Sequence, residues 1–176
     1  MNNLYFIKIK EDYINYLRKF DAKIQDNSGI KNNKPYIGIL IENNSGQKYF
    51  APLSSPKNKH KLFDKLEREN KLPIDIFLIR DNGRKVIGII NFNNMIPVRD
   101  ETIIYFNIKD DINYSLLKKE YLYCIKHSKE IINKSTKVYN LVTKYKKISL
   151  VKRSCNFKLL EEKSKDFNTI KISFNT

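Results

Sequence analysis

The segment IDIFLIRDNGRKVIGIINF, residues 74–92, decides the fold class of this chain. Two runs rich in isoleucine, valine and phenylalanine flank Asp81-Asn82-Gly83, and β-rich runs joined by such a turn predict a hairpin. The segment PYIGILIENNSGQKYFAPL, residues 35–53, repeats this arrangement around Asn43-Asn44-Ser45-Gly46. Sequential hairpins favour an antiparallel sheet over a parallel βαβ fold.

The rest of the chain adds strands and helices to these hairpins. Helical spacing of apolar residues predicts a helix from about residue 113, with a break near Asn133–Ser135. Further segments are expected as strands at 4–10, 95–98, 101–108 and 169–174, and as helices at 11–21, 55–70 and 155–167. We therefore expect one α+β domain over residues 1–176, with helices around a compact, highly curved antiparallel sheet or partial barrel.

The composition is that of a folded, strongly basic protein. Hydrophobic residues make up 41% of the 176 residues, and the net charge is +15. Residues 1–108 hold 18 basic and 12 acidic side chains, and residues 109–176 hold 16 and 7, so the excess is not confined to a tail. Such an excess of positive charge indicates a polyanionic partner, and nucleic acid is the first candidate. The alternative is that Lys- and Asn-rich composition only reflects an AT-biased genome.

The cysteine pattern and the lack of long apolar runs predict an intracellular protein. Cys124 and Cys155 have no CxxC partner and no zinc-like spacing to histidine, so both are expected to be reduced and buried. The N-terminus lacks the apolar region of a signal peptide, and no run approaches the ~20 apolar residues of a membrane span. We expect a cytoplasmic protein.

Motifs for several kinds of chemistry are missing from the sequence. It contains no P-loop, no GxGxxG, no HExxH and no EF-hand, and its acidic residues are spread among lysines. A two-metal nuclease needs clustered carboxylates, so neither a metal nor a cofactor is expected. Basic and hydroxyl side chains remain, and these suit a phosphodiester.

The segment APLSSPKNKH, residues 51–60, concentrates such side chains. Ser55 followed by Pro56 predicts an N-cap and first position of a helix. A helix N-terminus is also an anion site, where the hydroxyls of Ser54 and Ser55 could hold phosphate oxygens. A plain helix start is the competing interpretation.

Three more side chains complete the candidate site. Lys57 falls in the predicted first helical turn, where its charge opposes the helix dipole unless a phosphate binds nearby. His60, one turn later, could carry a proton, or it could simply face solvent. Lys34 precedes Pro35 at the entry to the predicted strand, where it could otherwise be a solvated loop residue.

Three ordered blocks resemble a known family. KPYIGILIE…YFAPLSSPKNKH, IGIINFNNMIPV and NLV…CNFKLLEEKSKDF together resemble the type III toxin–antitoxin endoribonuclease toxins of the ToxN/AbiQ family, over nearly the whole chain. The resemblance implies a sheet similar to that of MazF/Kid-like toxins. It also implies metal-independent cleavage of single-stranded RNA to 2′,3′-cyclic phosphate and 5′-hydroxyl ends.

The resemblance further implies partners and site residues. The expected partner is a small pseudoknot RNA antitoxin processed from a tandem-repeat transcript, often in a ring of three toxins and three RNAs, with a role in phage defence. The family's hydroxyl pair, lysines and histidine fall on Ser54, Ser55, Lys34, Lys57 and His60. Some members carry a tyrosine near the position of Ile30, so a mechanism that needs this tyrosine does not transfer.

Charge density suggests where RNA would bind. The segment KYKKISLVKR holds five positive charges and no acid, and KNKHK is the second basic block. The expected RNA-binding residues are Lys31, Lys59, Lys61, Lys144, Lys146, Lys147, Lys152 and Arg153. Two other functions compete with the nuclease. The first is a non-catalytic RNA-binding protein that uses its tyrosines for stacking on bases. The second is a DNA-binding protein, which ranks last because this sequence shows no convincing pair of recognition helices.

Overall fold

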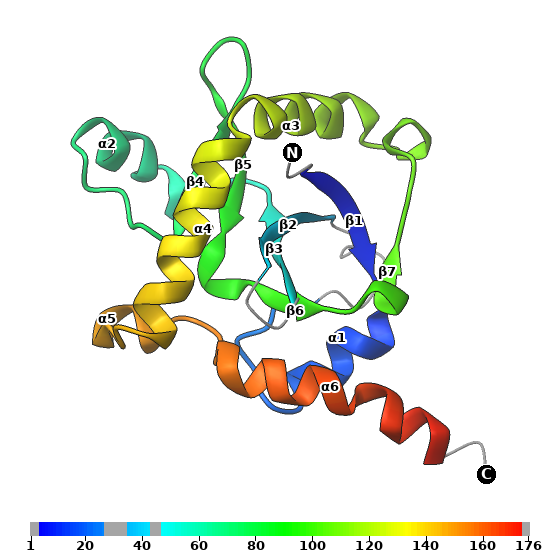
Figure 1. Cartoon of the computed structure of the whole chain (residues 1–176). Coiled ribbons are helices and arrows are strands. Elements are labelled where there is room, and N and C mark those ends of the chain that lie inside the picture. The colour runs from blue at the N-terminus through cyan, green and yellow to red at the C-terminus, as the bar shows by residue number, and fades with distance from the viewer. Residues whose placement is uncertain (1–3, 27–34, 43–46, 174–176) are drawn as a thin grey trace.

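The computed structural model describes residues 4–26, 35–42 and 47–173 and has an α+β fold (Figure 1). Seven antiparallel strands form one sheet in the order β4-β5-β3-β2-β1-β7, and β6 pairs with β3. This sheet is open, with β4 and β7 as its outer strands. The strands are β1 Tyr5–Ile9, β2 Tyr36–Glu42, β3 Lys48–Ser54, β4 Ile76–Arg80, β5 Val86–Asn91, β6 Ile96–Val98 and β7 Ile103–Ile104. The predicted α+β class and antiparallel sheet are confirmed.

Strand β3 holds the sheet together because both of its edges are paired. One edge pairs with β2, and the other is shared between two strands. Lys48–Phe50 pair with β6, whereas Leu53 and Ser54 pair with Ile90 and Ile89 of β5. The end of β3 is therefore fixed against β5, a strand that begins 32 residues later in the sequence.

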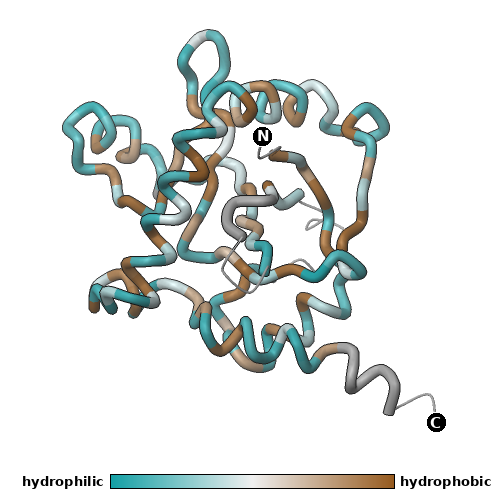
Figure 2. The backbone as a smooth tube through the Cα atoms, in the orientation of Figure 1, coloured by the Kyte–Doolittle hydropathy of each residue, from teal (hydrophilic) through white to brown (hydrophobic). Residues whose placement is uncertain are grey.

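Helices surround the sheet. They are α1 Glu11–Arg18, α2 Phe63–Arg68, α3 Tyr114–Lys126, α4 Ser128–Thr143, α5 Ile148–Val151 and α6 Phe157–Ser173, with 3₁₀ turns η1 Asn58–His60, η2 Phe92–Asn94, η3 Asp100–Thr102 and η4 Ile108–Asp110. Helix α3 packs on β4 and β5, α4 on β2, and α6 on β6 and α1. Figure 2 shows apolar residues along the strands and polar residues along much of the outer helices and loops, as burial of a main core cluster and a smaller one on β4 and β5 requires.

A partly buried polar network ties the last helix to the sheet. The hydroxyls of Tyr49 and Tyr139 both donate to Glu161 Oε1, at 2.7 and 2.5 Å. Lys158 Nζ lies 2.9 Å from Glu161 Oε2. Burial would raise the pKa of Glu161, but hydrogen bonds from Tyr139, Lys158 and Tyr49 outweigh it, and the net shift is downward. The CNFKLLEEKSKDF block thus supplies the contact between β3, α4 and α6.

Three predicted helix boundaries were wrong. The helical region breaks at His127, not at Asn133–Ser135, because α4 buries Ile131, Ser135 and Val138 and the Ser135 hydroxyl donates to the Ile132 carbonyl. Residues 169–173 continue α6 and form no strand. A strand needs a partner for its backbone groups, whereas extending an existing helix is inexpensive.

The third boundary concerns the segment after β3. Ser55 and Pro56 are not the N-cap and first residue of a helix. Extended Lys57 (φ −115°, ψ 168°) precedes the three-residue turn η1, and α2 begins only at Phe63. The helix N-terminus that would have faced a phosphate near Ser55 is therefore not formed.

The cysteines agree with the prediction. Cys124 and Cys155 are both free and buried, and burial raises the pKa of each thiol, to about 12 for Cys155. Tyr36 is also buried, at 1% exposure, so this tyrosine belongs to the core. Among the helices of the described residues, none combines the length and apolar character that crossing a membrane requires.

Candidate active site

A cavity of about 130 Å³ lies at the end of β3. Ser54 and Ser55 line it from this strand end, and Pro35 lines it from the entry to β2. The first half of α3 and the loop before it contribute Asn113, Leu116, Leu117, Glu120 and Asp111. The two hydroxyls of the APLSSPKNKH segment are therefore brought together in one concave site.

Ser54 is oriented by a strand that is distant in the sequence. Its side chain is 6% exposed, and its Oγ accepts a hydrogen bond of 2.9 Å from Asn91 Nδ2 at the end of β5. An accepted hydrogen bond leaves the hydroxyl proton of Ser54 available for donation. Ser55, the next residue, is exposed. Asn91 lies in the IGIINFNNMIPV block, but no sequence pattern pairs it with Ser54.

Glu120 is a second functional candidate that sequence reasoning missed. It is 5% exposed, lines the cavity from α3, and contacts the backbone of β5 closely at Gly88. A Cβ at Gly88 would lie 2.4 Å from Glu120 Oε1, so a larger residue at position 88 would displace the carboxylate from its present place. The available signal was an acid on the apolar face of a helix, between Leu117 and Cys124.

Lys57 and His60 have a different arrangement from the serines. The backbone N–H of Lys57 donates to His60 Nδ1 at 2.9 Å, and the His60 ring stacks on Phe63 with centroids 5.0 Å apart. The neutral imidazole therefore carries its proton on Nε2. The Lys57 side chain is exposed, and neither residue is among those that line the cavity.

The described lining offers hydroxyls and carboxylates but no cation. Asp111, on the rim, pairs with Lys8 at 3.6 Å. Lys34, the predicted catalytic lysine next to Pro35, lies outside the described residues, as does Lys31. Over the described ranges, no group of three His, Cys, Asp or Glu side chains could hold a metal ion.

The predicted RNA-binding residues are mostly exposed. The exposed lysines in this set are Lys61, Lys144, Lys146, Lys147 and Lys152, whereas the side chain of Lys59 lies outside the described part. Arg153 has a structural partner. Its guanidinium donates to both carboxylate oxygens of Asp75, at 2.6 and 2.8 Å, and Asp75 is only 2% exposed. Arg153 therefore anchors the segment after α5 to the residue before β4.

Comparison with known proteins places this geometry in a family. Residues 5–165 match the profile of the family described as toxin ToxN of the type III toxin–antitoxin system. This match spans nearly the whole chain. The chain belongs to the ToxN toxin family.

Curated members of the ToxN family are similar over most of their length. The endoribonuclease ToxN of Bacillus thuringiensis subsp. kurstaki is 32% identical over 94% of this chain and 85% of that protein. The endoribonuclease ToxN of Pectobacterium atrosepticum is 32% identical over 92% of each. The endoribonuclease AbiQ of Lactococcus lactis subsp. lactis is 32% identical over 92% of this chain and 87% of that protein.

Solved structures agree with the ToxN assignment. AbiQ, described as a lactococcal anti-phage endoribonuclease of the type III toxin–antitoxin system, matches with a TM-score of 0.80 and 30% identity over 96% of this chain and 99% of that one. A toxin described as selectively inhibited by a non-coding RNA pseudoknot matches with a TM-score of 0.80 and 31% identity over 95% and 99%. The predicted family is confirmed.

Proposed function

We propose that this chain is the toxin of a type III protein–RNA system and cleaves single-stranded RNA without a metal ion. The observation that carries the proposal is the Ser54–Ser55 cavity, in a family whose curated members are endoribonucleases. The 2′-OH attacks the adjacent phosphorus, the P–O5′ bond breaks, and the products carry a 2′,3′-cyclic phosphate and a 5′-OH. RNA supplies the nucleophile, so DNA is not a substrate.

The serine hydroxyls would bind the reacting phosphate. Donors aimed at the non-bridging oxygens stabilise the charge that develops on the phosphorane. Ser54 suits this role because Asn91 occupies its oxygen and leaves its proton to donate. Ser55, exposed at the same cavity, would donate to the second oxygen.

A cation is required as well, because the described lining carries two carboxylates. We assign this role to Lys34, which adjoins Pro35 in sequence, with Lys57 as the second candidate. Proton transfer needs a base for the 2′-OH and an acid for O5′. Lys34, Lys57 and His60 are candidates from the sequence, and Glu120 joins them because its carboxylate lines the cavity.

The inhibitor would be a small RNA. A pseudoknot RNA inhibits one structural relative, and a processed non-coding RNA regulates the antiviral system of another. We extend this to a repeat-derived pseudoknot RNA bound here in a ring of three toxins and three RNAs, in the cytoplasm and in phage defence. Light scattering on the co-expressed complex would test the stoichiometry. A short tandem repeat upstream of the gene is expected.

Two finer structural assignments accompany this function. We assign residues 1–176 to one endoribonuclease domain, because all seven strands and every described α-helix except α2 contribute to one large core cluster. Helix α2 packs on a small second cluster formed by β4 and β5 of the same sheet. We also relate the curved antiparallel sheet to that of MazF/Kid-like toxins. Superposition on a MazF-like toxin would test this relation, and a different strand order would contradict it.

Product analysis tests the enzymatic proposal. Purified protein is incubated with single-stranded RNA in EDTA, and the ends are identified by their sensitivity to phosphatase and kinase. We expect cyclic phosphate ends from the wild type, and losses of about 10²–10³-fold in the Ser55→Ala and Lys34→Met variants. Glu120→Gln keeps the shape of the side chain and tests its role as a base. Complete loss of cleavage in EDTA, or linear 3′-phosphate as the primary product, would contradict the mechanism.

Cell growth separates the nuclease from the alternative function. Expression of the wild type without antitoxin should arrest bacterial growth, and expression of Ser55→Ala should not. RNA binding without growth arrest or cleavage would instead identify a non-catalytic RNA-binding protein.

A further inference from the structure

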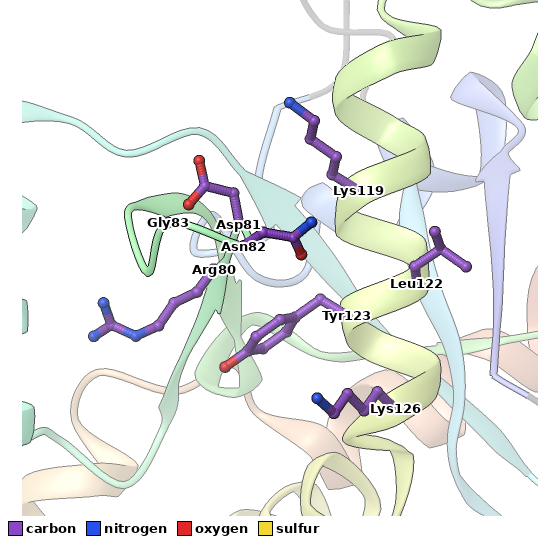
Figure 3. Close-up of a pocket in the computed structure, with 8 residues that line it drawn as sticks. All are labelled: Arg80, Asp81, Asn82, Gly83, Lys119, Leu122, Tyr123 and Lys126. Atoms are coloured by element: carbon purple, nitrogen blue, oxygen red, sulfur yellow. The ribbon is translucent and has the colours of Figure 1, made fainter.

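A cleft of about 640 Å³ lies between α3 and the turn of the β4–β5 hairpin. Lys119, Tyr123 and Lys126 project from α3 toward this turn, which carries Asp81 and Asn82 (Figure 3). The helix residues have the spacing i, i+4, i+7 and therefore share one side of α3. The cleft shares no lining residue with the Ser54–Ser55 cavity, and its volume lies within the roughly 300–1,000 Å³ of ligand sites.

The two lysines supply the positive charge of the cleft. Arg80, at the edge of the cleft, is neutralised by Asp64 and Glu67, with N–O distances of 2.6 and 2.5 Å. Lys119 and Lys126 are exposed, and neither forms an ion pair with any residue of the described ranges. Seven residues of helix separate them by about 10 Å, which is enough to contact successive phosphates of one strand. Asp81 is the one carboxylate among the lining residues, so the two lysines leave the lining net positive, which suits a polyanion.

An aromatic ring lies between these charges. The Tyr123 ring stacks on His127 with centroids 4.3 Å apart and an interplanar angle of 23°, and it also contacts Phe77. The His127 contact orients the ring, which comes from the side of α3 that lines the cleft (Figure 3). Aromatic rings flanked by basic side chains are how proteins bind single-stranded nucleic acid, through base stacking and phosphate contacts.

We propose that this α3–hairpin cleft is a nucleotide-binding site for RNA, with Lys119 and Lys126 on phosphates and Tyr123 against a base. The choice of RNA as ligand rests on the proposed function. The same chemistry could serve a substrate strand that extends beyond the cleaved bond, or the RNA that inhibits the toxin. In either case α3 serves two sites, because Leu116, Leu117 and Glu120 line the Ser54–Ser55 cavity, whereas other α3 residues line this cleft.

Binding of an uncleavable RNA tests the proposal. The probe is a fluorescein-labelled 2′-O-methyl 20-mer of uridine, whose Kd is measured by anisotropy between 50 and 200 mM KCl. For single strands, each phosphate contact adds about 0.7 to the slope of log Kd against log salt concentration. Loss of two contacts in Lys119→Gln/Lys126→Gln should therefore reduce this slope by about 1.4 and weaken binding about 25-fold at 0.1 M salt. Tyr123→Leu should weaken binding at least about 5-fold, whereas Tyr123→Phe keeps the ring and should bind like the wild type.

A matched control removes the same charge elsewhere. Lys10→Gln/Lys165→Gln changes two exposed lysines at α1 and α6, at the opposite end of the molecule from α3 (Figure 1). If the cleft variant has the Kd and salt slope of this control, or if Tyr123→Leu binds like Tyr123→Phe, the proposal is wrong. Melting temperatures establish that each variant is folded.

Two further arms identify the source of the RNA. A rise in KM for a 20-mer substrate, with kcat/KM for a trinucleotide unchanged, assigns the cleft to the substrate strand. In the cleft variant, a larger fold loss of affinity for a folded pseudoknot RNA than for the 20-mer probe assigns it to the inhibitor. Absence of cleavage by the wild type would overturn the proposed enzyme, while the uncleavable probe would still test the cleft.

Discussion

The side-chain amide of Asn91 donates a hydrogen bond of 2.9 Å to the hydroxyl of Ser54, and this bond joins the ends of β5 and β3. Ser54 and Ile89 are paired across the same two strands, so the sheet itself sets the distance. The Ser54 hydroxyl is thereby held by a residue 37 positions away. Because Asn91 is the donor, the Ser54 hydroxyl can still donate its own proton to another acceptor.

Asn91→Asp should reverse this hydrogen bond and impair catalysis. A carboxylate would accept the Ser54 proton, which would then be unavailable to the phosphate, and its charge would repel that phosphate. We expect kcat/KM for RNA cleavage to fall about 10²-fold, near the effect of losing one transition-state donor. Asn133→Asp, an exposed change on α4, is the control and should be neutral. Equal activity of the two variants would show that Ser54 needs no orientation.

Arg153→Ala should destabilise the protein. It leaves the carboxylate of Asp75 buried without its partner, which costs up to about 3–5 kcal/mol for fully buried pairs. The Arg153 side chain is 44% exposed, so we expect about 2–3 kcal/mol less free energy of unfolding in urea. Lys152→Ala, at an exposed neighbour, should change it by less than about 0.5 kcal/mol. If Arg153→Ala kept full stability but lost RNA affinity, the residue would be an RNA contact.

Glu161 should make stability fall in acid. Its pKa is lowered below the ordinary value of 4.5 in the folded protein, so the native state binds fewer protons there than the unfolded chain. The stabilisation is complete above pH 4.5 and is lost as the pH falls through the folded pKa. Urea unfolding between pH 3 and 7 should therefore show a smaller decline for Glu161→Gln than for the wild type. Parallel curves for the two proteins would exclude this network as the cause.

Lys146→Glu/Lys147→Glu tests the basic segment before α5. Both side chains are exposed, and a negative charge at Lys147, the N-cap of α5, does not oppose the helix dipole. We expect weaker binding to the RNA antitoxin and a salt slope about 1–2 units flatter, measured by anisotropy at several salt concentrations. Lys10→Glu/Lys165→Glu supplies the same change in charge at α1 and α6. An unchanged slope in the basic-segment variant would place that segment away from the RNA.

The sequence by itself determined the local features of this protein. The Asp81-Asn82-Gly83 turn and its flanking strands formed as predicted, because turn chemistry and alternation act between residues close in the chain. The blocks that resemble the ToxN family identified the family correctly. Boundaries that depend on packing were missed, since Ser135 is helical once its hydroxyl and its buried face are satisfied within α4.

Only the tertiary structure decided how the candidate site is built. Ser54 and Ser55 were predicted from one segment, but their surroundings come from elsewhere: Asn91 through the β3–β5 pairing, and Glu120 through the packing of α3 against Gly88. His60, five residues after Ser55, instead accepts a hydrogen bond from the backbone N–H of Lys57 and stacks on Phe63. Strand pairing and helix packing join residues far apart in the chain, and a local pattern carries no information about which ones meet.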